Sequence, residues 1–85
     1  MTQYYVNPQD VEIDPALGRV YAGRRLRAII DRDGQIVPVL VHREVIGDDV
    51  LFTVSDRMQA ERVDAFRIAG WPTILVEDEW TEDDL

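Results

Sequence analysis

The sequence contains neither cysteine nor lysine among its 85 residues. Without cysteine, the chain has no disulfide, no thiolate ligand for a metal and no thiol nucleophile. It also lacks an apolar run long enough to cross a bilayer, and its polar start, MTQYYVNPQD, has no basic region of the kind that opens a signal peptide. We therefore expect a cytoplasmic protein without a membrane partner.

All nine basic residues are arginines, because lysine is missing. Arginine is suited to bidentate contact with phosphate or carboxylate groups, so the composition is compatible with an anionic ligand or an acidic partner. An all-arginine composition is equally typical of a GC-rich genome. Composition alone leaves both explanations open.

Negative charge is concentrated at the C-terminus. Six of the 17 acidic residues lie in the last nine positions, which leaves 17 − 6 = 11 acids against nine arginines in residues 1–76. The body therefore carries a charge of only −2 out of the total of −8. We interpret residues 1–76 as one domain and residues 77–85 as an acidic tail. Trp80 is the one large apolar anchor in this tail.

Hydrophobic patterning predicts a short α+β chain. Glycines at positions 34 and 70 are typical of helix ends, and the sequence IGDD at 46–49 is typical of a hairpin turn. The predicted strands are residues 11–13, 36–44, 50–54 and 73–76, and the predicted helices are residues 24–34 and 56–70. This β-α-β-β-α-β order predicts a small mixed β-sheet with two covering helices.

The helix predicted at 56–70 is the element around which we expect the site to form. Ser55 or Asp56 would cap its first turn, and Gln59 would complete a capping box with Asp56. Helical spacing places five residues on an apolar arc, with Arg62 in the middle of it. These five are Met58, Val63, Ala65, Phe66 and Ala69.

A positively charged helix start is a natural anion site, because its free N–H groups and dipole favour negative charge. Arg57, Gln59 and Arg62 lie in the first two turns, so they are candidate phosphate ligands. The alternative is a structural Arg62 that pairs with Asp56 or Glu12 while its stem packs on the sheet.

Other candidate sites carry weaker patterns. Three carboxylates of the predicted helix are hard ligands for a divalent metal, but their spacing does not converge, so we interpret them as a solvated face and expect no metal site. These are Asp56, Glu61 and Asp64. The single histidine, His42, we interpret as a surface or strand-end residue. Arg19, Arg24 and Arg25 belong to an arginine cluster that would contact nucleic acid or, preferably, the carboxylates of a protein partner.

Three segments resemble the ParB/sulfiredoxin-like superfamily, which includes N-terminal domains of chromosome-partition proteins and small ParB-like phage proteins. They are VEIDPALGRV, DRDGQIVPVLV and VSDRMQAERVDAFRIAGWPTILV. The resemblance implies a ParB-like fold and, at the third segment, a nucleoside triphosphate with magnesium, held by Ser55, Arg57, Gln59 and Arg62. The family's glycine is missing from this turn, where a Cβ obstructs close approach to phosphate. The sulfiredoxin reaction is excluded because its nucleophile is a cysteine.

Two functions follow as hypotheses. The first is a non-catalytic module for protein interaction, inhibition or regulation that uses Arg19, Arg24, Arg25, Trp80 and the acidic tail. The alternative is a nucleotide- or phosphate-binding domain, with a CTP-type pocket at the helix start, that acts in DNA partition or regulation. A DNA-binding or nuclease role ranks third, because the sequence offers no convergent catalytic set. The edges of so small a sheet would also permit a homodimer.

Overall fold

The computed structural model describes residues 2–78, which form one five-stranded mixed sheet and two α-helices. The strands are β1 (Thr2–Val6), β2 (Val11–Ile13), β3 (Val39–Ile46), β4 (Asp49–Val54) and β5 (Ile74–Asp78), and the helices are α1 (Arg24–Asp33) and α2 (Arg57–Ala69). Two short 3-10 turns, Pro8–Asp10 and Pro15–Leu17, flank β2. The fold class predicted from the sequence is therefore confirmed.

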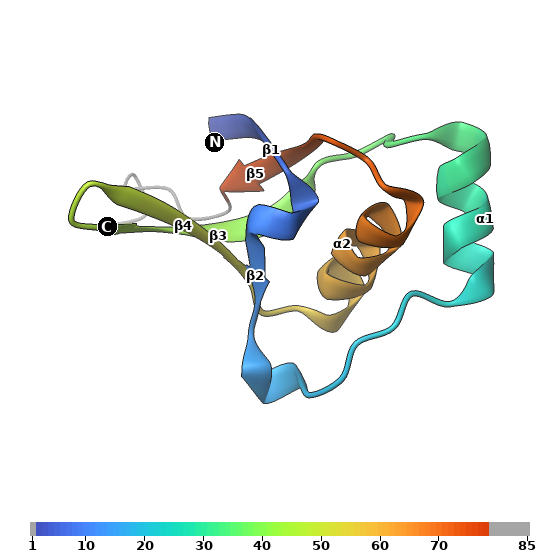
Figure 1. Cartoon of the computed structure of the whole chain (residues 1–85), viewed down its shortest axis with the longest axis horizontal. Coiled ribbons are helices and arrows are strands. Elements are labelled where there is room, and N and C mark those ends of the chain that lie inside the picture. Colours follow the sequence, from blue (N-terminus) through green and yellow to red (C-terminus); the bar gives the residue numbers. More distant parts are fainter. Residues whose placement is uncertain (1, 79–85) are drawn as a thin grey trace.

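The strands lie in the order β1-β5-β3-β4-β2. β3 and β4 form the predicted antiparallel hairpin, with Ile46 opposite Asp49 across the turn. β5 runs parallel to β3, and β2 runs parallel to β4. Both helices lie on one side of the sheet, with α2 between the sheet and α1 (Figure 1). β4, which lies between β3 and β2, ends at Val54, and α2 begins shortly after it at Arg57.

β1 is a strand that the sequence analysis missed. It pairs antiparallel with β5, with Tyr4 opposite Val76. Tyr4 also stacks obliquely on Phe52, with the two ring centroids 5.1 Å apart. The same pairing extends β5 as far as Asp78, so the first two residues of the predicted acidic tail, Glu77 and Asp78, belong to the sheet.

The core is built mainly from valines of the central strands and the inner face of α2. Val39, Val41 and Val76 have no exposed surface, and Phe66 is the largest fully buried side chain. Alternation along the strands places these valines on one face of the sheet, where α2 covers them. Trp71 packs against Phe66, with ring centroids 4.9 Å apart.

The apolar arc predicted for α2 is correct in its centre and wrong at both ends. Val63, Ala65 and Phe66 are buried as expected. Met58 and Ala69 are exposed instead, Met58 to 71%. They lie in the first and last turns of the helix, where it extends beyond the surface that it covers on the sheet.

Candidate functional site

The start of α2 forms as the sequence predicts, with Asp56 as its N-cap. The Asp56 carboxylate accepts a hydrogen bond of 3.2 Å from the backbone N–H of Gln59. The reciprocal half of the predicted capping box is wrong, because the Gln59 side chain turns toward β3. A carboxylate therefore occupies the position at which the helix start would otherwise offer an N–H group to an anion.

Arg62 lies half-buried between α2 and the segment that leads into β3. Its guanidinium donates to the backbone oxygens of Pro38 at 3.0 Å and Val37 at 2.5 Å. Burial lowers the pKa of Arg62 below its ordinary value, but an arginine in this setting stays protonated. The predicted ion pair with Asp56 or Glu12 is wrong, since main-chain carbonyl groups provide the acceptors that a buried guanidinium needs.

Gln59 joins Arg62 to the sheet. Its side-chain oxygen accepts from the Arg62 guanidinium at 3.0 Å and from the backbone N–H of Leu40 at 3.2 Å. A single amide oxygen thus holds both the arginine and the start of β3. Gln59 and Arg62 form one structural unit, as the i, i+3 spacing in a helix allows.

Arg57 points to a different part of the molecule. Its guanidinium donates to the backbone oxygens of Leu17 at 2.6 Å and Arg19 at 3.4 Å, in the loop before α1. The structure therefore brings Gln59 and Arg62 together and directs Arg57 elsewhere. The three candidate ligands share the helix start but bind separate segments of the chain.

The outer polar residues of α2 also bind main chain. The Asp64 carboxylate accepts from the backbone N–H of Ala22 at 2.8 Å, so its interpretation as a solvated residue is wrong. Arg67 donates to the backbone oxygens of Pro8, at 2.8 Å, and Val11. Together with Arg57, Gln59 and Arg62, these residues tie α2 to three separate segments of the chain, residues 8–11, 17–22 and 37–40. No sequence motif signals this role, because the partners are backbone groups.

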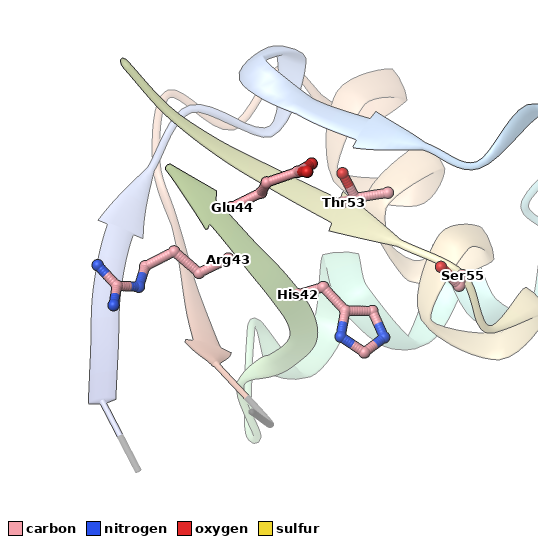
Figure 2. A pocket seen from close by; sticks show the side chains of 5 residues that line it. All are labelled: His42, Arg43, Glu44, Thr53 and Ser55. Atoms are coloured by element: carbon pink, nitrogen blue, oxygen red, sulfur yellow. The ribbon is translucent and has the colours of Figure 1, made fainter. Parts of the chain in front are cut away.

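Ser55, the remaining candidate phosphate ligand, lines a pocket of about 360 Å³ on the β3–β4 hairpin. Figure 2 shows His42, Thr53 and Glu44 around the same pocket, while Arg43 extends away from these residues. Hairpin register explains the grouping, because His42 is directly opposite Thr53 and residues two apart share a face. The turn predicted at 46–49 fixes which residues of the two strands lie opposite each other. Strand alternation from that turn would therefore have grouped His42, Glu44 and Thr53 on one face. Of the two positions considered for His42, the strand end is wrong, because His42 lies within β3, where it is partly exposed.

The arginines assigned to a partner are on the surface. Arg19, Arg24 and Arg25 are exposed, and the Arg19 guanidinium lies 5.6 Å from the ring centroid of Tyr21, which is itself exposed. Trp80 lies outside the described residues.

Residues 2–78 contain no group of three or more histidine, cysteine, aspartate or glutamate side chains arranged to hold a metal ion. Within the same part of the chain, no helix has the length and apolar character needed to cross a membrane.

Comparison with known proteins identifies the architecture. No family model matches the sequence, and no curated protein matches it. Among solved structures, the chain is similar to the C-terminally truncated chromosome-partitioning protein ParB from Caulobacter crescentus in complex with CTP-gamma-S, with a TM-score of 0.64 and 18% sequence identity. The match covers 98% of this chain and 47% of that one, so this chain spans about half the length of the ParB structure. The described chain therefore has a ParB-like fold.

Proposed function

We propose that this chain is a non-catalytic module for protein interaction, inhibition or regulation built on a ParB-like fold. The observation that carries the proposal is that Asp56, Arg57 and Arg62, three charged residues at the start of α2, are engaged in structural hydrogen bonds. Asp56 caps the first turn, Arg57 binds the loop at residues 17–19, and Arg62 binds the segment at residues 37–38. Groups that would hold a phosphate hold the fold together instead.

The energetics support the same reading. For Arg62 to bind a phosphate, it would have to leave two carbonyl groups and the oxygen of Gln59, each a charge-assisted bond contributing about 1.5–3 kcal/mol. The Asp56 carboxylate at the helix start would in addition repel an incoming anion. Phosphate binding at this helix start is therefore disfavoured relative to the structural role of these residues.

The partner contacts in this proposal come from residues outside that network. Arg19, Arg24 and Arg25 are exposed around the start of α1, and they offer bidentate donors to carboxylates. Trp80 and the acidic residues that follow Asp78 would supply a second, oppositely charged contact. A surface with separated basic and acidic regions is suited to electrostatic selection of a partner.

A nucleotide-binding function is the second candidate, because the similar ParB structure holds CTP-gamma-S. Under this alternative, a nucleoside triphosphate with magnesium would contact Ser55, Arg57, Gln59 and Arg62. It requires the bonds of Arg57 and Arg62 to open on binding. Nucleotide binding would therefore change the surroundings of residues 55–62, whereas the interaction module leaves them unchanged when nucleotide is added.

Two-dimensional NMR titration with CTP, ATP and GTP, with and without magnesium, tests the choice. We expect no saturable shift of the amide resonances of residues 55–62. Saturable shifts there that disappear in Arg57→Ala would contradict the interaction module and establish the nucleotide site. Arg25→Ala is the matched control, because Arg25 is an exposed arginine at the first turn of the other helix.

A further inference from the structure

The β3–β4 hairpin extends beyond the strands that flank it. β5 pairs with β3 only from Val39 to Val41, and β2 pairs with β4 only from Phe52 to Val54. Within residues 2–78, no strand pairs with the outer edge of β3 from Arg43 to Ile46 or with that of β4 from residue 49 to residue 51. Figure 1 shows this end of the hairpin standing out from the body of the molecule. We call residues 43–51 the ribbon end.

The ribbon end carries apolar side chains that no described part of the chain covers. Val45 lies directly opposite Val50, and the two are 59% and 50% exposed. Ile46, next to the turn, is 57% exposed. Alternation places Val45 on the same face as the fully buried Val39 and Val41. Arg43 interrupts the apolar row on β3, but on β4 the side chains of Phe52 and the buried Val54 share this face with Val50, so apolar side chains run from the core along β4 to the ribbon end.

Backbone groups on the outer edges of the ribbon end likewise have no strand partner within residues 2–78. In an antiparallel ladder, alternate residues direct their N–H and C=O groups away from the partner strand. An exposed edge with apolar side chains is a template for adding a further strand, and recognition domains use such edges to bind extended peptides. The ribbon end therefore offers both hydrogen-bonding groups and apolar contacts to an incoming strand.

The negative charge of the ribbon end favours an added strand with basic side chains. Glu44, Asp48 and Asp49 lie on it, whereas its one arginine, Arg43, pairs with the buried Asp78 at 3.3 Å. A second copy of this chain would bring the same acidic groups into contact, which opposes self-pairing. An extended segment with basic side chains would complement them.

We infer that the ribbon end is a docking surface for an extended, basic segment of a partner protein, which adds as a strand to the open edge of β3. This inference rests on the proposed interaction function and gives it a surface and a partner chemistry. Valine or isoleucine at alternate positions of the partner would pack beside Val45 on the same face of the extended sheet. Lysine or arginine between them would face the surrounding carboxylates.

NMR titration with a blocked peptide that alternates valine and lysine tests this inference. We expect saturable shifts of the amide resonances of Arg43 to Ile46, and no response to a peptide that alternates valine and glutamate. Val45→Lys should weaken binding about tenfold or more, since it removes apolar contact and adds a like charge. Ile68→Lys is the matched control, because Ile68 is 56% exposed on α2, away from the hairpin.

Four results would overturn the inference: no shift in residues 43–46, an equal response to the glutamate peptide, an equal loss of binding in Ile68→Lys, or dimerisation of the free chain that Val45→Lys abolishes. The last result would identify a second copy as the occupant. Failure here is distinct from failure of the proposed function, which the nucleotide titration at residues 55–62 decides. A silent peptide titration together with a silent nucleotide titration would reject this surface and leave the interaction function standing.

Discussion

Arginines in this chain are used as structural donors to the main chain. Arg57, Arg62 and Arg67 each bind two backbone oxygens from segments distant in sequence. The planar guanidinium suits this task, because it presents several donors in a fixed geometry and stays charged when partly buried. Phosphates and carboxylates were the acceptors expected from the sequence, whereas backbone carbonyl groups leave no pattern in a sequence.

Replacing Arg62 tests its structural role. Arg62→Ala should lower the free energy of unfolding by at least about 1.5 kcal/mol, the contribution of one charge-assisted bond, because Val37, Pro38 and Gln59 all lose a charged donor. Urea unfolding followed by circular dichroism measures the change. Arg25→Ala, at an exposed position, should change the stability by less than about 0.5 kcal/mol. Equal effects of the two substitutions would contradict the structural role.

At the scale of elements, α2 organises the loops as well as the core. Its capping residue and its apolar centre were predictable, because both depend on local sequence periodicity. Its ties to the loops at residues 17–22 and 37–40 were not predictable, because they join residues far apart in the chain. β1 was missed for the same reason. Its five residues acquire strand structure from pairing with β5, which lies at the other end of the sequence.

The bond between Asp64 and the loop before α1 can be tested by hydrogen exchange. Asp64→Ala removes the acceptor of the Ala22 N–H and should accelerate exchange of that amide about fivefold, which corresponds to about 1 kcal/mol of local stability. Asp64→Asn retains an oxygen acceptor and should show a smaller effect. Glu61→Ala, one turn earlier on the helix, is the control. Unchanged exchange at Ala22 in Asp64→Ala would show that the loop is held by other contacts.

At the scale of the whole molecule, stability depends on a small core that covers one face of the sheet. A chain of this length is expected to have a free energy of unfolding of about 4–13 kcal/mol. Phe66 is the largest fully buried side chain, and it contacts Trp71 next to the end of α2. A single cavity at Phe66 would therefore remove a large part of the free energy of unfolding.

Truncating Phe66 measures how much the core contributes. Phe66→Ala should lower the free energy of unfolding by about 4 kcal/mol through lost transfer energy and the cavity that it leaves. Phe66→Leu should cost less, since most of the volume is retained. Met58→Ala is the control at an exposed apolar residue of the same helix and should have little effect. Thermal unfolding of the three variants distinguishes the core contact from a general intolerance of α2.

Side chains of α2 hydrogen-bond to the backbone of the loop before α1 at Leu17, Arg19 and Ala22. These bonds do not depend on loop side chains, whereas Leu17, Val20 and Ala22 also pack in or against the core. The exposed loop positions Arg19 and Tyr21 are thus places at which evolution, or a designer grafting new binding residues, can change the surface while the path of the loop is retained.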